Sequence, residues 1–191
     1  MKGWQIPEPL LTLQTKRLVL RRLVLDDAAD LFEYAQDPLV SKYTYWTPHR
    51  SIADSQEFLT GLAEQYERDR LIHWGIVLAS EAKLIGTCGF VNWHPAHARA
   101  EIGYALARSH WHNGYMTEAV SAAIAFGFHV MMLNRIEAMC MKENVASARV
   151  LEKAGMQFEG VLREYAFVKG AYLDLSLYAI LKPKAANRAV L

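Results

Sequence analysis

The sequence predicts a single α/β (α+β) domain whose core is a mixed, mostly antiparallel, twisted sheet of about six to seven strands flanked by about four helices. Three observations lead to this fold class. Several stretches carry apolar residues every three to four positions, the period of an amphipathic helix. Other stretches alternate, or are continuously apolar, over the length of a strand. These strand-like stretches outnumber the helical ones, and several follow one another directly, which favours antiparallel pairing.

The first half of the chain contains a predicted strand, two helices and a hairpin. Residues 17–24 alternate enough for a strand, and residues 25–37 start with acidic side chains, which the dipole of a helix favours at its beginning. Residues 51–69 have helical spacing and a serine and an aspartate that can cap the first turn. Residues 73–80 and 82–94 are largely apolar and adjoin a short polar turn, which predicts a hairpin of strands.

The middle of the chain adds a strand and a long helix. Residues 98–107 form the next predicted strand. Apolar residues then recur every four positions, as on the buried face of a helix packed on a sheet. These residues are Met116, Val120, Ile124 and Phe128.

The last third of the chain completes the domain. Residues 134–141 are short and mostly apolar, as in a buried strand. Residues 144–155 predict a helix that begins with Asn144 as its N-cap and ends at a glycine. Residues 157–168 and 171–181 predict a closing hairpin of two strands.

Size and composition exclude several classes of protein. With 191 residues, 52% hydrophobic and 21% charged, the chain fits one domain spanning residues 1–191, with its core at about 15–181, a short N-terminal arm and a C-terminal tail. The formal net charge of +1 gives no global field that would attract nucleic acid or a membrane surface. Cys88 and Cys140 lie in apolar runs and are expected to be free thiols. Neither a signal peptide nor a membrane span is visible, so we expect a cytoplasmic protein.

The stretch HWHNGYMTEAV, residues 110–120, places Gly114 where the long helix begins. A helix N-terminus offers unpaired backbone N–H groups and roughly half a positive charge, which together attract phosphate, and a glycine allows close approach. The alternative interpretation is that Gly114 only supplies a special backbone angle in a turn. The spacing matches neither the Rossmann motif nor the P-loop.

Two longer segments carry a resemblance to a known family. Residues 100–119 (AEIGYALARSHWHNGYMTEA), followed by residues 134–164 (NRIEAMCMKENVASARVLEKAGMQFEGVLRE), resemble the GNAT superfamily of N-acetyltransferases, and within it the RimJ/RimL-like branch of ribosomal-protein alanine acetyltransferases. The resemblance implies a GNAT-like domain that moves an acetyl group from acetyl-CoA to a primary amine by direct attack in a ternary complex.

The resemblance also implies where coenzyme A binds. Main-chain N–H groups of the glycine stretch would hold its diphosphate, at His112, Asn113, Gly114, Tyr115 and Met116. The strand at residues 98–107 would offer backbone groups to the pantetheine arm, next to a bulge and a splay of the sheet, at Ile102, Tyr104, Ala105 and Leu106. The stretch departs from the superfamily pattern Q/R-x-x-G-x-G/A, because Trp111 replaces the first polar residue and Met116 stands where Gly or Ala is usual. We expect the side chain of Met116 to point into the core.

Glu101 is the candidate general base. It is a carboxylate within an otherwise apolar strand, and burial would raise its pKa and make it a usable base, acting through a water. The alternative is a structural ion pair with Arg99 or another basic residue on a neighbouring strand. Glu164 is a weaker candidate, because its strand is more mixed.

Asn144 and Ser147 lie at the start of the last helix, where their residue types favour capping. The family resemblance adds functional roles: Ser147 would donate a hydrogen bond to the coenzyme A sulfur, and Asn144 would contact the cofactor or a water. Many members of the superfamily protonate the thiolate with a tyrosine on this helix, and Leu151 stands at that position here. A backbone N–H at Tyr104 or Ala105 would hold the oxyanion.

Aromatic residues are candidates for the acceptor site. Tyr45 and Trp46 belong to the run KYTYWTP between the first two helices, and Trp93 ends a strand. Such residues can equally well cover the core. Histidine pairs within residues 94–97 and 110–112 have no evident third ligand, so no metal site is predicted.

The acceptor amine stays open at this stage. An α-amine has a pKa near 7.7 to 8.0 and a lysine side chain near 10.4, so a single weak carboxylate base suits a chain terminus better. This favours a ribosomal or other protein N-terminus. The alternatives are a small amine such as an amino acid, a polyamine or an aminoglycoside, and a non-catalytic sensor that only binds acetyl-CoA. A homodimer is possible, and no direct nucleic-acid or membrane partner is expected.

Overall fold

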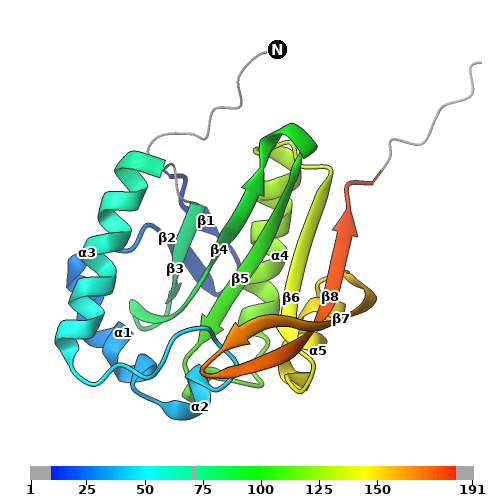
Figure 1. The fold of residues 1–191 in the computed structure, drawn as a ribbon. Coiled ribbons are helices and arrows are strands. Elements are labelled where there is room, and N and C mark those ends of the chain that lie inside the picture. The colour runs from blue at the N-terminus through cyan, green and yellow to red at the C-terminus, as the bar shows by residue number, and fades with distance from the viewer. Residues whose placement is uncertain (1–9, 70–71, 184–191) are drawn as a thin grey trace, which may run out of the picture.

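A central sheet covered by helices on both faces forms the protein (Figure 1). The structure, a computed structural model, describes residues 10–69 and 72–183. In these residues the sheet has eight strands in the order β1-β2-β3-β4-β5-β6-β8-β7. Their bounds are β1 Leu13–Gln14, β2 Leu18–Arg21, β3 Ile72–Leu78, β4 Lys83–His94, β5 Arg99–Leu106, β6 Arg135–Met141, β7 Gln157–Val168 and β8 Ala171–Leu181. Neighbouring strands pair antiparallel except β5 and β6, which are parallel.

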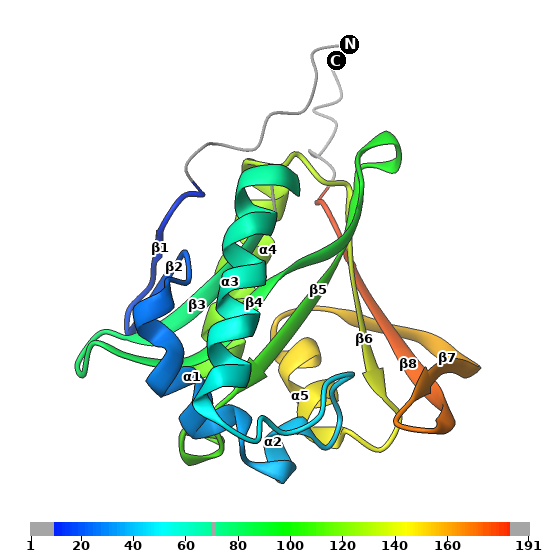
Figure 2. The same ribbon diagram turned by 60° about the vertical axis from the view of Figure 1, so that its left-hand side comes forward.

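Five α-helices are present in the same described residues. They are α1 Ala28–Ala35, α2 Pro38–Ser41, α3 Ile52–Asp69, α4 Tyr115–His129 and α5 Val145–Lys153. Figure 2 shows α1 and α3 in front of the sheet and α4 behind it. The predicted fold class is confirmed, with more elements than expected because β1 and α2 are too short to produce a periodic pattern. The α2 helix depends on local chemistry instead, since Pro38 opens it and the Asp37 side chain accepts from the Leu39 N–H.

Each face of the sheet has its own apolar layer. Under α4, the fully buried Trp74 packs edge-on against Phe90 and Phe126, with ring centroids 6.3 Å and 5.1 Å away. Under α1 and α3, the layer includes Leu31 and Leu59, which are both 3% exposed. Burial of these two layers fixes which residues of each strand point to which face.

The pairing between β5 and β6 ends early. The two strands are paired at three positions only, the last being Glu101 opposite Glu137. Beyond this point β5 stays with β4 as far as Leu106, whereas β6 stays with β8 as far as Met141. Figure 1 shows the two strands diverging, and we call the opening between them the gap. The splay expected from the family resemblance is therefore present.

The β7–β8 hairpin folds back toward the segment that follows α2. Val168 and Leu175 are buried in a small cluster against which Tyr43 packs. The Lys169 ammonium at the hairpin tip donates to the Ser41 carbonyl over 2.6 Å. The hairpin and the α2–α3 loop thus meet on the face of the sheet opposite to α4 (Figure 1).

The two cysteines and the helices agree with the sequence in the described part of the chain. Cys88 and Cys140 are both free and buried, as expected from their apolar surroundings. No helix within residues 10–69 and 72–183 combines the length and the apolar character needed to cross a membrane.

Gly127 allows α4 to lie close to the sheet. A Cβ there would come within 2.8 Å of the Ile136 Cδ1 atom and 2.9 Å of the Phe90 Cζ atom, so we expect Gly127→Ala to lower the free energy of unfolding by about 1–3 kcal/mol. Gly61 in α3 is the matched control, because nothing lies within 4 Å of its added Cβ. Gly61→Ala should raise the free energy of unfolding by about 0.5–1 kcal/mol. Urea denaturation measures both, and equal effects would contradict the close approach.

Candidate active site

The start of α4 has no side-chain cap. Gly114 is the N-cap residue, with φ of 76°, and the first helical hydrogen bond runs from the Glu118 N–H to the Gly114 carbonyl. The N–H groups of the three residues between them therefore have no acceptor within the helix. In α5, by contrast, the Asn144 side chain accepts from the Ser147 N–H over 3.1 Å. The α4 terminus keeps the free N–H groups and the positive end of the dipole that an anion requires.

The turn before α4 is anchored to the end of β5. The Trp111 indole N–H donates to the Leu106 carbonyl over 2.8 Å. Met116 is 5% exposed and packs in the layer under α4, so its side chain points into the core as expected and does not fill the turn. The predicted phosphate contacts lie together here, with exposed His112, Asn113 and Gly114, half-buried Tyr115 and buried Met116.

The backbone of β5 offers alternate groups to the gap. In an antiparallel pair, successive residues point their N–H and C=O groups to opposite sides. The Ala107 N–H donates to the Ile85 carbonyl on the β4 side, so Ala105 also faces β4. The residues of β5 that face the gap are Ile102, Tyr104 and Leu106. Because the Ala105 N–H is directed at β4, the Tyr104 N–H is the better placed of the two expected oxyanion donors. The Leu106 carbonyl accepts from Trp111.

The face of the gap toward α5 carries a pair of hydroxyl groups. The Tyr104 and Ser147 hydroxyls are 2.8 Å apart, and the Tyr104 hydroxyl also lies 3.3 Å from the Ser147 carbonyl. Burial raises the pKa of Tyr104 above its ordinary value, so the phenol stays protonated. Burial likewise raises the pKa of Cys140, while a hydrogen bond to Ser147 opposes that shift. Leu151 is 1% exposed and packs in the apolar layer under α4.

Glu101 points to the opposite face of the sheet. Its neighbours Ala100 and Ile102 are buried under α4, and strand alternation turns the carboxylate the other way. Partial burial is the largest cause raising the pKa of Glu101; the Asn92 hydrogen bond opposes it, and the charge of Glu137 adds to it. Arg99, the ion-pair partner considered for Glu101, instead bonds Glu137 over 2.8 Å.

A β-bulge aims Asn92 at this carboxylate. The β4–β5 register shifts between Val91 and His94, and Asn92 has φ of 48° within the irregularity. Its side-chain amide donates to Glu101 Oε2 over 2.8 Å. The expected bulge is thus on β4 beside Glu101 and not inside the 102–106 segment of β5. Bulges commonly redirect a side chain near an active site in this way.

Tyr45 lies near Glu101, and Tyr165 lies near Tyr45. Tyr45 comes from the α2–α3 loop and Tyr165 from the irregular middle of β7, and they are 66% and 58% exposed. The pKa of Tyr45 is raised first by partial burial and then by the charges of Glu101 and Tyr165. Sequence reasoning identified Tyr45 but not Tyr165, because no periodic signal marks the register shift between Leu162 and Ala166.

The two other candidate acceptor residues and the alternative base, Glu164, have different surroundings. Trp46 packs against the apolar layer under α1 and α3. Trp93 packs against the layer under α4, on the face opposite to Glu101. Glu164 has φ of 48°, and its N–H donates to the Asp174 side chain over 2.9 Å.

An open pocket lies beside Tyr45. Its volume is about 720 Å³, and it extends between the α2–α3 loop and α3. Its lining includes Tyr45, Trp46, His49, Arg50, Glu57 and Phe58. Within residues 10–69 and 72–183, no three His, Cys, Asp or Glu side chains are grouped as metal ligands.

The gap therefore has a carboxylate on one face and a pair of hydroxyl groups on the other. Glu101 can accept a proton on the side of the α2–α3 loop, while Ser147 can donate a hydrogen bond on the side of α5. The β5 backbone lies between them, and Tyr104 lies beyond its last position paired with β6. Proton removal, oxyanion stabilisation and leaving-group stabilisation are the requirements of acyl transfer to an amine.

Fold and site together define an acetyl-CoA-dependent N-acetyltransferase. A family model described as an acetyltransferase (GNAT) domain matches residues 17–157, and the chain belongs to this family. The uncharacterized N-acetyltransferase p20 of Bacillus licheniformis is 37% identical over 176 residues, covering 92% of this chain and 99% of that protein.

More distant relatives differ in their acceptors. The [ribosomal protein uS5]-alanine N-acetyltransferase of Escherichia coli is 27% identical, covering 96% of this chain and 97% of that protein. The spermidine N(1)-acetyltransferase of Vibrio cholerae is 24% identical, covering 91% and 98%. Among solved structures, a GNAT-family acetyltransferase from Bacillus anthracis matches with a TM-score of 0.79 and 29% identity, covering 90% of this chain and 98% of that one. Mycobacterium smegmatis RimJ in complex with CoA-disulfide matches with a TM-score of 0.76 and 28% identity, covering 86% and 81%.

We expect Asn92→Gly to shift the acidic limb of the pH–rate profile to higher pH. The Asn92 hydrogen bond favours ionised Glu101, so its loss should raise the pKa of Glu101 further. Glycine retains the left-handed backbone at this position. Ala98→Gly is the control, because Ala98 is also left-handed, with φ of 46°, but offers no side-chain hydrogen bond. An unchanged limb in Asn92→Gly would mean that the amide does not act on the carboxylate.

Tyr104→Phe should lower kcat by about tenfold and leave the KM for acetyl-CoA nearly unchanged, because the ring still packs but no longer orients the Ser147 hydroxyl. Combination with Ser147→Ala tests the coupling, and the double variant should be little worse than Ser147→Ala alone. Tyr178→Phe is the control, since that hydroxyl reaches Glu152 at 3.5 Å instead of Ser147. Additive losses in the double variant would contradict a shared role.

Proposed function

We propose that the enzyme acetylates the α-amine of a peptide or protein N-terminus, as expected for the RimJ/RimL-like branch. The observation that carries this proposal is the position of Glu101, a partly buried carboxylate at the edge of the gap, which accepts a hydrogen bond from the neutral amide of Asn92 and lies near Tyr45. A carboxylate of this kind can receive one proton from one amine.

Acetyl-CoA would enter from the α4 side. Its diphosphate would bind the main-chain N–H groups at residues 112–116, and its pantetheine arm would follow the β5 edge at Ile102 and Tyr104. The incoming amine attacks the acetyl carbonyl carbon while Glu101 takes the amine proton, directly or through a water. The Tyr104 N–H would stabilise the oxyanion. When the C–S bond breaks, the thiolate would accept a hydrogen bond from Ser147.

The strength of the base favours an α-amine. An α-amine with a pKa near 7.8 is easier to deprotonate than a lysine with a pKa near 10.4, by about 3.5 kcal/mol. The raised pKa of Glu101 improves it as a base but leaves it a carboxylate. The less basic amine is therefore the better match for Glu101.

The ion pairs around Glu137 argue against binding of a polycationic acceptor at that point. Glu137 lies next to Glu101, but Arg99 and Arg135 bond it over 2.8 Å and 2.6 Å. Arg135 also bonds Glu159. These carboxylates are therefore already paired, whereas recognition of a polyamine would need several that are free to meet its ammonium groups. The pocket beside Tyr45 offers room for a chain that continues beyond the reacting amine.

A panel of acceptors tests the proposal by thiol release from acetyl-CoA and by mass spectrometry. Peptides beginning with a free alanine or serine should gain one acetyl group at the α-amine. The same peptides with a blocked N-terminus and an internal lysine should gain none. Preferred turnover of spermidine or an aminoglycoside would replace the proposal with a small-amine activity, and coenzyme A binding without turnover of any acceptor would identify a sensor.

Glu101→Gln should lower turnover several-tenfold, on the order of 10²-fold at most, because the amide cannot accept the amine proton. The affinity for coenzyme A should stay nearly unchanged in calorimetry, since Glu101 lies on the face away from the diphosphate turn. Glu164→Gln is the matched control, because its carboxylate lies in the exposed middle of β7. Equal loss in both variants, or none in Glu101→Gln, would remove Glu101 as the base.

A further inference from the structure

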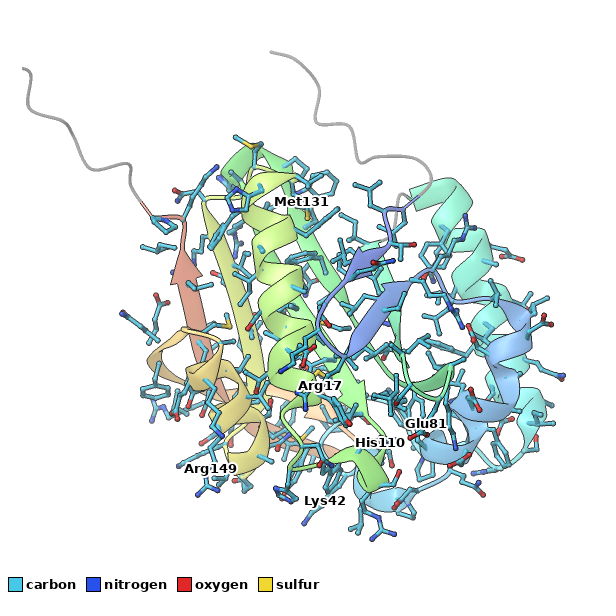
Figure 3. All side chains as sticks on the ribbon, turned by 180° about the vertical axis from the view of Figure 1, so that it is seen from behind. Arg17, Lys42, Glu81, His110, Met131 and Arg149 are labelled. Atoms are coloured by element: carbon cyan, nitrogen blue, oxygen red, sulfur yellow. The ribbon has the colours of Figure 1, made fainter. Side chains whose placement is uncertain are left out.

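Arg17 spans the turn that precedes α4, although it belongs to the connection between β1 and β2. Its Nη1 donates to the Asn113 carbonyl over 2.9 Å, and its Nε donates to Glu118 Oε2 over 2.7 Å. Its own backbone N–H donates to Glu118 Oε1 over 2.8 Å. The guanidinium carbon lies 4.4 Å from the centre of the Tyr115 ring. Figure 3 shows Arg17 at the foot of α4 near His110.

The bond to Asn113 fixes the direction of the next N–H group. A trans peptide is planar, and its C=O and N–H bonds point in opposite directions. Because Arg17 holds the Asn113 carbonyl, the N–H of Gly114 must point away from Arg17. This N–H is the first of the main-chain donors at the start of the helix. Gly114, with φ of 76°, has no side chain that restrains its backbone. A hydrogen bond from outside the turn therefore has its largest effect at this position.

The bonds from Arg17 to Glu118 offset a negative charge that would repel a bound anion. Glu118 lies in the first turn of α4, where its carboxylate would repel a diphosphate. Burial would raise the pKa of Glu118, but hydrogen bonds from Thr15 and Arg17 outweigh it and the pKa is lowered. The carboxylate is therefore ionised, and Arg17 supplies the compensating positive charge.

We propose that Arg17 is the positioning residue of the diphosphate-binding turn: it orients the Gly114 N–H through the Asn113 carbonyl and neutralises Glu118. This proposal rests on the proposed function, in which the turn binds the diphosphate of acetyl-CoA. Arginine is required because its planar group makes two hydrogen bonds in different directions and stacks on Tyr115 at the same time. A lysine would carry the charge but could not hold all three partners.

Arg17→Lys tests the proposal with two acetyl donors. Acetyl-CoA contains the diphosphate, and S-acetylpantetheine has the same thioester arm without it. In the variant we expect the KM for acetyl-CoA to rise about tenfold with kcat nearly kept, since one charge-assisted hydrogen bond of the turn is lost. The kinetic constants for S-acetylpantetheine should not change. Calorimetry with coenzyme A should show the same loss of affinity.

Arg21→Lys is the matched control. Arg21 lies on β2 and makes two bonds to Asp27, at 2.8 Å and 2.6 Å, remote from the turn. Its replacement should lower stability without changing the ratio of the two donors. Arg17→Lys would overturn the proposal if both donors lost activity equally, which indicates general damage, or if neither did. A wild-type enzyme that uses the two donors equally well would instead refute the diphosphate site itself, and with it the cofactor part of the proposed function.

Discussion

The short parallel pairing of β5 with β6 is the constraint on which the rest of the site depends. It stops at Glu101 and Glu137, so the backbone of β5 beyond that point faces a gap in the middle of the sheet. Unpaired backbone groups are costly in a protein interior, and a structure keeps them only where something else holds the strands apart. Here β4 holds β5 and β8 holds β6 to their ends. A ligand with amide groups, such as the pantetheine arm, can complete the interrupted ladder.

The gap also explains how one active site can receive two substrates. Strand alternation sends Tyr104 toward α5 and Glu101 toward the α2–α3 loop. The acetyl donor and the amine can therefore approach from opposite faces and meet where the sheet is open, which is the geometry that direct transfer in a ternary complex requires. The hairpin, held to α2 by Lys169, and the α2–α3 loop border the amine side.

Much of the fold follows from local patterns, but the site depends on contacts that no local pattern contains. The periodicity around Met116 and the caps of α5 predict their helices because such signals span ten or more residues. The two residues of β1 and the four of α2 have no such signal. Glu101 and Ser147 could be chosen from residue type and family resemblance. The roles of Asn92, Tyr165 and Arg17 depend on a bulge, an irregular strand and a contact across the fold, which appear only when distant segments are placed together.

The free energy that raises the pKa of Glu101 affects both its strength as the proposed base and the stability of the fold. Its pKa is raised in the folded protein chiefly because burial disfavours the ionised form. Between the ordinary pKa and this raised value the folded state binds more protons than the unfolded state, so stability falls as pH rises through that interval. Above this raised pKa, the ionised carboxylate lowers the free energy of unfolding by the full amount that corresponds to the pKa shift. The same cost makes the carboxylate a stronger base toward an amine. The Asn92 hydrogen bond offsets part of this cost, and the pKa of Glu101 stays above the ordinary value of a glutamate.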